Sequence, residues 1–245
     1  MQTRTLILLA LLIALMTTPA WATAPTEDAQ AMGERLAACA ACHGPRGEGM
    51  PGSEYFPHLA GKPAGYLFAQ MQGFRDGRRH YPQMVYLMRN WDDAWLAQIA
   101  QFYAGLPVLE TRHAAPPSLS VLDQARAQSL VQDGDARRDL PACSACHGAQ
   151  LNGIEPGVPA LAGLPVDYLI AQLGGWITGA RHSIAPDCMS TVVKALEPGE
   201  VRLLASYIAA QLPEAGSHPA PAGSWALPRD CGGTTGFDPA RGAVP

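Results

Sequence analysis

The residues with the clearest chemical potential lie in two nearly identical segments, CAACHG at 39–44 and CSACHG at 143–148. Each segment has two cysteines three positions apart and a histidine directly after the second cysteine. Such a set could bind zinc, close a redox disulfide or hold a c-type haem. A structural zinc site needs two further ligands, usually a second Cys or His pair, and neither segment has one at a matching spacing. The redox disulfide would need a βαβ pattern nearby, and the sequence has none.

The Cys-x-x-Cys-His pattern is typical of c-type haem attachment, in which both thiols form thioethers with one porphyrin and the histidine ligates its iron. Because the pattern occurs twice, we predict two covalently bound haem c groups, each with one iron. The predicted attachment and ligand residues are Cys39, Cys42 and His43 in the first segment and Cys143, Cys146 and His147 in the second.

The second axial ligand of each iron is predicted to be a methionine, chosen by comparing the two halves of the chain. Met84 lies seven residues before the helix expected to begin at Trp91, and Met189 lies seven residues before Leu196. Met88 has no methionine at the equivalent position of the second half. Met/His ligation stabilises reduced iron and fills both axial positions, which favours electron transfer over catalysis. The alternative role for these methionines is core packing.

These segments recur because the chain repeats itself. Residues 58–80 match residues 160–182 at an offset of 102, and residues 99–107 match residues 203–213 with a small shift. Two homologous units of about 95 residues explain this pattern better than a solenoid does. Within each unit the apolar residues recur at helical spacing and no segment alternates as a strand would, so the predicted fold class is all-α.

The chain begins with a positive charge, an apolar run of eleven residues and an Ala-Trp-Ala sequence ending at Ala22. This is the pattern of a cleaved signal peptide, and the run is too short to span a bilayer. We therefore expect residues 1–22 to be removed and the mature protein to be periplasmic, with no transmembrane segment. The remaining expected divisions are a first domain at 23–115, a second at 116–213 and an irregular Gly- and Pro-rich tail at 214–245.

The formal net charge is −4, and nothing in this mildly acidic composition indicates a nucleic-acid partner.

The sequence resembles the diheme cytochrome c4 family, in which two class I cytochrome c domains follow one another. The resemblance covers roughly residues 25 to 213 and rests on CAACHGPRGEG, FPHLAGKPAGYL and IAQFYAGL in the first half. In the second half it rests on GDARRDLPACSACHG, VPALAGLPVDYLIAQL and LASYIAAQL. It implies tandem class I domains, each with a few helices around a covalent haem.

The resemblance also implies roles for two matching pairs of residues. The carbonyls of Pro57 and Pro159 would accept a hydrogen bond from the ring N–H of the haem-ligating histidines, which fixes the tautomer of the ring. Arg79 and Arg181 would contact haem propionates. The alternative for both arginines is an ordinary solvated position on the surface.

Two cysteines lie outside the haem motifs, Cys188 directly before Met189 and Cys231 in the tail. Leftover cysteines often pair in an oxidising compartment, so we hypothesise a disulfide that fixes the tail beside the second haem. The alternative is two unpaired thiols and a loose tail.

Three functions are compatible with these residues. The leading one is an exported diheme electron carrier, a non-enzymatic protein that passes electrons from a donor complex to an acceptor such as a terminal oxidase. The second is the electron-accepting subunit of a dehydrogenase complex. The third is a catalytic cytochrome that oxidises a sulfur compound, which would need an exchangeable axial ligand.

Overall fold

The computed structural model describes residues 32–50, 53, 55–108, 115–213, 217–224, 226–234 and 237–238. The chain divides into two units, residues 1–34 and 35–245, and both Cys-x-x-Cys-His segments lie in the second unit. The predicted signal peptide, with its cleavage site after Ala22, lies outside the described residues. Residues 109–114, a part of the join between the two expected domains, also lie outside them.

The described part of the chain is helical and contains no β-strand beyond isolated bridges, which confirms the all-α class. Its α-helices are α3 (Ala37–His43), α4 (Ala64–Arg75), α5 (Pro82–Met88), α6 (Asp93–Ala104), α7 (Val121–Gln132), α8 (Cys143–His147), α9 (Val166–Thr178), α10 (Cys188–Lys194) and α11 (Glu200–Ala209). Two short 3₁₀ helices, η1 (Ala136–Arg138) and η2 (Gly232–Thr234), complete the set. None of the described helices is long and apolar enough to cross a membrane.

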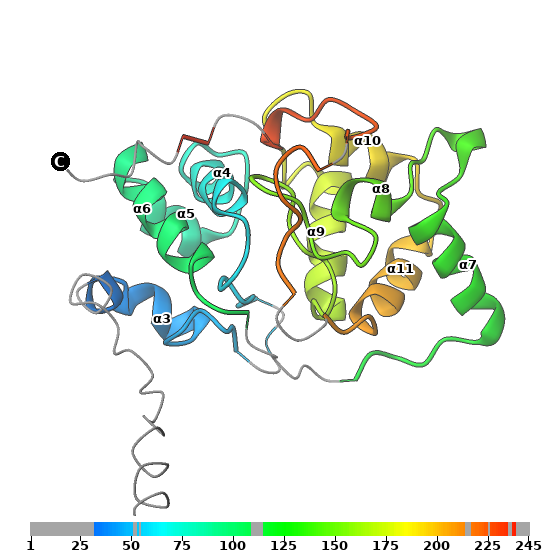
Figure 1. Ribbon diagram of the computed structural model, residues 1–245, viewed down its shortest axis with the longest axis horizontal. Coiled ribbons are helices and arrows are strands. Elements are labelled where there is room, and N and C mark those ends of the chain that lie inside the picture. Colours follow the sequence, from blue (N-terminus) through cyan, green and yellow to red (C-terminus); the bar gives the residue numbers. More distant parts are fainter. Residues whose placement is uncertain are drawn as a thin grey trace, which may run out of the picture. The chain divides into compact units, whose positions relative to one another are not determined.

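In the first half, α4 packs against both α5 and α6 (Figure 1). The buried face of α4 carries Leu67, Phe68, Met71 and Phe74, whose spacing places them on one side of a helix. Helix α6 begins after Asp92, whose side chain accepts a hydrogen bond from the backbone N–H of a residue in the first turn, at 2.8 Å. This is an ordinary N-cap, and it fixes where α6 starts.

The second half repeats the order of α3 to α6 as α8 to α11, with α7 and η1 before them. Helix α9 packs against α10 and α11, α11 against α7, and α7 against α8. Leu130 of α7, Leu169 of α9, and Leu204 and Ile208 of α11 belong to one buried cluster. The helix that ends in a haem motif, the long helix after it, the short methionine-bearing helix and the final helix therefore recur in both halves.

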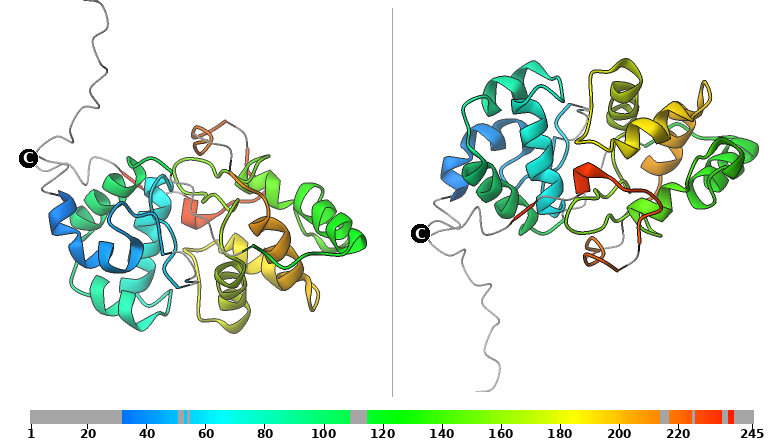
Figure 2. Two further views of the ribbon diagram at one scale, coloured as in Figure 1. Left: turned by 90° about the horizontal axis from the view of Figure 1, so that it is seen from below. Right: turned by 90° about the horizontal axis from the view of Figure 1, so that it is seen from above.

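The described residues after α11 include η2 and a bridge between Ile154 and Ala220. This segment contacts both halves. Cys231 forms a disulfide with Cys188 of α10, while η2 packs against α4 of the first half. Farther along, the ring of Phe237 lies 5.6 Å from that of Phe68. Figure 2 shows this orange and red segment running between the two groups of helices.

Candidate haem-binding sites

The two haem motifs have the same backbone geometry. Helix α3 ends at His43 and helix α8 ends at His147. After each, the chain turns back so that a glycine N–H, from Gly49 or Gly153, donates to the carbonyl of the preceding histidine at 2.7 Å. Both glycines have positive φ, and a Cβ on either would lie within 2.7 Å of backbone atoms. The turn therefore requires glycine at these two positions.

Both histidine rings are buried and held by a backbone carbonyl. The Nδ1–H of His43 donates to the carbonyl oxygen of Pro57, and that of His147 to the carbonyl of Pro159, each at 2.8 Å. These are the hydrogen bonds that the family resemblance implies. Burial lowers the pKa of both imidazoles, so both rings are neutral at pH 7. Neutral imidazole with Nδ1 occupied leaves Nε2 as the atom that can ligate a metal.

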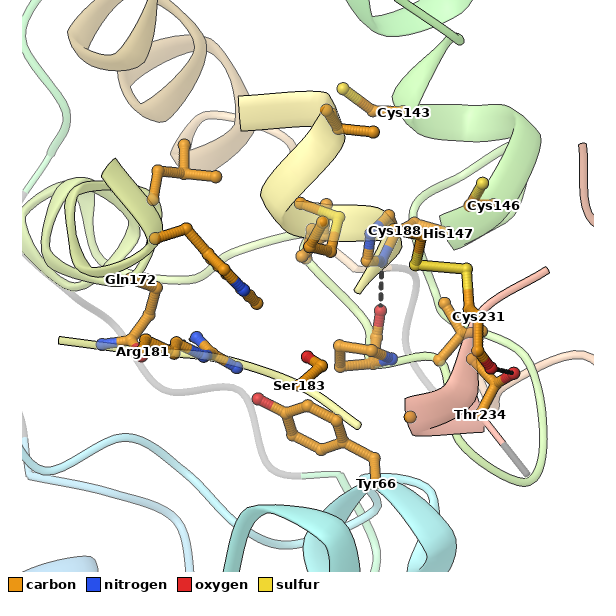
Figure 3. Close-up of a pocket in the computed structure, with 18 of the residues that line it drawn as sticks. Tyr66, Cys143, Cys146, His147, Gln172, Arg181, Ser183, Cys188, Cys231 and Thr234 are labelled. Atoms are coloured by element: carbon orange, nitrogen blue, oxygen red, sulfur yellow. Dashed lines mark hydrogen bonds between the residues drawn. A yellow bond between two sulfur atoms is a disulfide. The ribbon is translucent and has the colours of Figure 1, made fainter. Parts of the chain in front are cut away.

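Each histidine lies in the wall of a largely apolar cavity that also contains a predicted methionine ligand. The first cavity, of about 260 Å³, is lined by Cys39, Cys42, His43 and Met84 among others. The second, of about 170 Å³, is lined by Cys143, Cys146 and His147 (Figure 3). Met189 lies in the wall of the same cavity. The structure thus brings each predicted set of four residues together. Met88, which has no methionine counterpart in the second half, is buried and also lines the first cavity.

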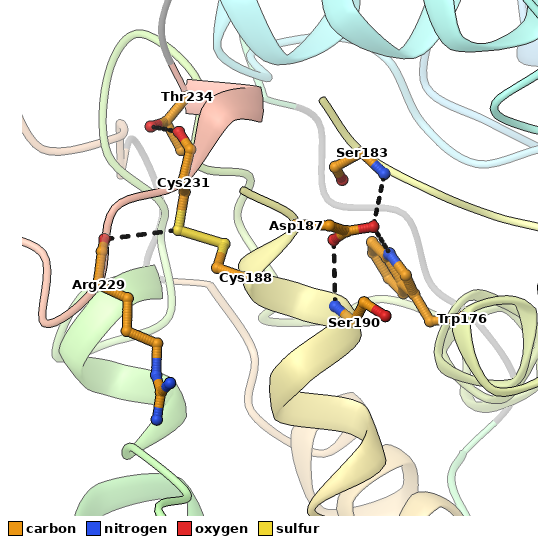
Figure 4. Close-up of a disulfide and its surroundings, with 8 residues drawn as sticks. All are labelled: Trp176, Ser183, Asp187, Cys188, Ser190, Arg229, Cys231 and Thr234. Atoms are coloured by element: carbon orange, nitrogen blue, oxygen red, sulfur yellow. Dashed lines mark hydrogen bonds between the residues drawn. A yellow bond between two sulfur atoms is a disulfide. The ribbon is translucent and has the colours of Figure 1, made fainter. Parts of the chain in front are cut away.

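Met189 is the second residue of α10, and the start of this helix is fixed in two ways (Figure 4). The carboxylate of Asp187 accepts hydrogen bonds from the backbone N–H groups of Ser183 and Ser190, at 2.8 and 3.1 Å, and from the indole N–H of Trp176 at 3.2 Å. The disulfide from Cys188 provides the second attachment. Helix α5, which carries Met84, has no side-chain cap and instead has a proline as its first residue.

Arg79 and Arg181 lie where the two halves meet. Their backbones form an antiparallel bridge, and each guanidinium donates to the side chains of both Gln70 and Gln172. Arg79 donates to Gln70 at 3.1 Å and to Gln172 at 2.5 Å, and Arg181 donates to the same two oxygens at 2.9 and 2.7 Å. Each guanidinium also lies over an aromatic ring of its own half, Arg181 at 3.9 Å from the ring of Trp176. Arg181 is buried, which departs from the solvated alternative.

Tyr66, Tyr168 and Lys62 complete this cluster, and the charges of the two arginines lower the pKa values of both tyrosines against the effect of burial. Burial alone would raise the pKa of Tyr66, but the charges of Arg181, Arg79 and Lys62 lower it to about 8. Burial lowers the pKa of Lys62 to about 8 as well. Lys62, Arg79 and Arg181 line both cavities, so the positive charge is common to the two sites.

The charges around the cavities fit haem and do not fit zinc. Three cationic side chains line both cavities, yet no Asp or Glu is among the described residues that line either one. Buried charge without a counter-charge is costly, and the two propionates of each haem would supply the missing anions. Across the described residues, no group of three or more His, Cys, Asp and Glu could hold a metal ion. Burial also raises the pKa of Cys143 to about 11, so this thiol is protonated at pH 7 in the polypeptide alone.

Two Cys-x-x-Cys-His segments, each beside an apolar cavity with a methionine in its wall, define a c-type cytochrome with two covalently bound haem c groups. The chain belongs to the diheme cytochrome c4 family, whose members are electron carriers. The profile of the cytochrome c family matches residues 30–103.

Sequence comparison supports this assignment over most of the chain. A thiosulfate dehydrogenase electron acceptor from Thiomonas intermedia (strain K12) is 32% identical over 78% of this chain and 82% of its own. A cytochrome c4 from Pseudomonas aeruginosa is 32% identical over 74% of this chain and 87% of its own.

Comparison with solved structures supports the same family assignment. Reduced cytochrome c4 from Pseudomonas stutzeri superposes with a TM-score of 0.62 at 26% identity, covering 75% of this chain and 98% of the other. A thiosulfate dehydrogenase from Marichromatium purpuratum also gives a TM-score of 0.62, at 34% identity. The superposition covers 76% of this chain but only 40% of that larger chain.

Two features of the site were not predicted from the sequence. Gln70 and Gln172 are paired repeat positions, but neither was expected to contact the arginines. Lys62 was not singled out either. The sequence did contain a signal, because the equivalent position of the second half holds the apolar Leu164, and a lysine at such a position is unusual.

Proposed function

We propose that this protein is a periplasmic diheme electron carrier that accepts electrons from a dehydrogenase, of which thiosulfate dehydrogenase is the best-supported example. In this proposal residues 1–22 are a signal peptide cleaved after Ala22, and residues 23–115 and 116–213 are the two haem domains. The tail at 214–245 is an added segment. The two predicted haem c groups support export, because c-type haem assembly fits an exported chain.

The residues proposed to hold each iron are a histidine and a methionine. His43 and Met84 would occupy the two axial positions in the first domain, and His147 and Met189 those in the second. When bound, the haem iron supplies a one-electron ferric–ferrous couple. The soft thioether of methionine would favour the ferrous state, and with both residues engaged the iron would offer no open position to a substrate.

Arg79 and Arg181 are proposed to pair with the propionates at the join between the domains. The support is their position in the walls of both cavities, Arg181 buried and Arg79 half-buried, with glutamine side chains rather than carboxylates as bonded neighbours. Both guanidinium groups retain unused N–H donors in these contacts, because a guanidinium has five.

We infer the dehydrogenase partner from the sequence identity between this chain and proteins named as thiosulfate dehydrogenase electron acceptors. The Thiomonas relative is one, and a second from Stutzerimonas stutzeri (strain A1501) is 33% identical over 70% of this chain. The function of those relatives requires an electron donor protein, so a specific redox partner is expected for this chain too.

Rapid-mixing spectroscopy of the purified holoprotein tests this proposal. Oxidised protein, first shown to carry two haems per chain, is mixed with thiosulfate alone, with a thiosulfate dehydrogenase alone, and with both. We expect the ferrous absorbance bands to appear rapidly only when substrate and dehydrogenase are both present. An unrelated single-haem cytochrome c at equal concentration serves as the control for non-specific electron acceptance.

Two results would count against the proposal. Turnover with thiosulfate alone would indicate a catalytic cytochrome. Reduction no faster than that of the unrelated cytochrome would remove thiosulfate dehydrogenase as the donor and leave the general carrier role.

A further inference from the structure

Lys62 is the most buried cation among the described residues that has no bonded acid. It lies at the turn before α4, with 4% of its surface exposed and with Ala60, at 1%, close by in sequence. Lysine is almost never buried to this extent unless it is paired. Its burial therefore needs a physical explanation.

No carboxylate among the described residues provides that explanation. None of the ion pairs found there involves Lys62, and neither of the two cavities that it lines has Asp or Glu in its described wall. The charged group that acts on Lys62 itself is the Tyr66 phenol, which opposes the lowering of the pKa of Lys62 by burial, and Arg79 and Arg181 act on the same tyrosine. Lys62 therefore shares both cavity walls with two other cations and pairs with no carboxylate of the described residues.

The position of Lys62 is asymmetric although the fold is repeated. The equivalent residue of the second half is Leu164, which is buried in the apolar core with 4% exposure. The arginines and glutamines of the join occur once in each half, whereas the lysine occurs only in the first half. One ammonium group therefore lines both cavities, and the second half contributes no counterpart.

We propose that Lys62 is a single cation shared by the two haem sites, which pairs with propionate carboxylates and raises the reduction potential of both haems. The inference deepens the proposed electron-carrier function and rests on it. A positive charge favours the ferrous state because reduction removes one positive charge from the iron site. The interaction acts through a partly desolvated join, where charges are screened less than in water.

Spectroelectrochemical titration of Lys62→Leu holoprotein tests this inference. Leucine is the residue that the second half has at this position, so the replacement suits a buried site. Lys62→Met serves as a second variant if the first loses its methionine–iron band. Lys194→Leu is the matched control, because it removes the same charge from an exposed position.

We expect the ratio of ferrous to ferric iron at a fixed applied potential to fall about tenfold for both haems in Lys62→Leu, equivalent to about 59 mV for a one-electron couple. Lys194→Leu should shift the reduction potential of neither haem by more than a small fraction of that amount. Unchanged potentials in both Lys62 variants would overturn the proposal. A shift of one haem alone would overturn the shared role.

Failure of the inference about Lys62 can be distinguished from failure of the proposed function. If that function were wrong, the wild-type protein would not accept electrons from the dehydrogenase, whatever the effect of Lys62 on the potentials. If only the role of Lys62 were wrong, both variants would be reduced by the dehydrogenase and titrate like the wild type.

Discussion

Replacing both cysteines of the Cys188–Cys231 disulfide with serine should destabilise the second half of the protein without releasing Met189. The disulfide closes a loop with a sequence separation of 43 residues. The chain-entropy relation for a loop of this length gives a contribution of about 4 kcal/mol to the free energy of unfolding. We treat this as an upper limit, because native disulfides typically contribute about 2–4 kcal/mol.

Met189 should stay in place in this variant because α10 has a second attachment. The carboxylate of Asp187 accepts three hydrogen bonds at the start of the helix, and none of them involves the disulfide. The sulfur-to-iron charge-transfer band of the second haem should therefore persist in the folded variant, even though the tail loses its covalent attachment to α10.

Urea unfolding followed by circular dichroism gives the free energy, and absorption spectroscopy reports the methionine ligand. Thr234→Ala is the matched control: it removes the 2.7 Å hydrogen bond to the carbonyl of Cys231 but keeps the disulfide, and should cost about 1 kcal/mol. A loss below about 1 kcal/mol in the double serine variant would refute the view that the disulfide restrains the tail. Loss of the charge-transfer band would refute the assignment of the helix start to Asp187.

The remaining predictions concern the proposed ligands and a buried acid. Met84→Ala and Met189→Ala should each abolish the sulfur-to-iron band of one haem and lower the potential of that haem only; bands that persist in both variants would contradict the ligand assignment. Glu200→Gln should lower the unfolding free energy at pH 7 by about 2 kcal/mol, because the buried carboxylate accepts from Arg126 and Arg138 at 2.7 and 2.8 Å. These contacts hold the pKa of Glu200 below its ordinary 4.5, against the opposing effect of burial. Its contribution should be complete above pH 4.5 and be lost as the pH falls through the lower, folded-state pKa, so wild type and variant should converge in acid urea titrations.

Much of each site could be predicted from the sequence because the relevant information is local or repeated. The Cys-x-x-Cys-His spacing lies within one turn of helix, so it placed His43 and His147 at equivalent helix ends. The shared register selected Met84 and Met189, and both line the expected cavities. Helical periodicity was sufficient for the all-α class.

The contacts between the halves could not be predicted in the same way. Helical spacing indicates that Gln70 and Gln172 share a helix face with apolar neighbours, but it does not say which residue about 100 positions away will meet that face. The cross-bonding of both glutamines to both arginines depends on how two separate helical groups pack. Lys62 was missed for a related reason, since its place in the walls of both cavities depends on how the two halves pack.

The reciprocal bonds at the join have an evolutionary consequence. Each of Arg79 and Arg181 donates to a glutamine of its own half and to the glutamine of the other. A substitution at any of these four positions therefore removes a hydrogen bond from a residue in each half at once. After a gene duplication, copies can drift apart wherever each half is self-contained, as Lys62 and Leu164 have done. At these four positions the copies must instead change together, so the join should preserve the ancestral repeat longest.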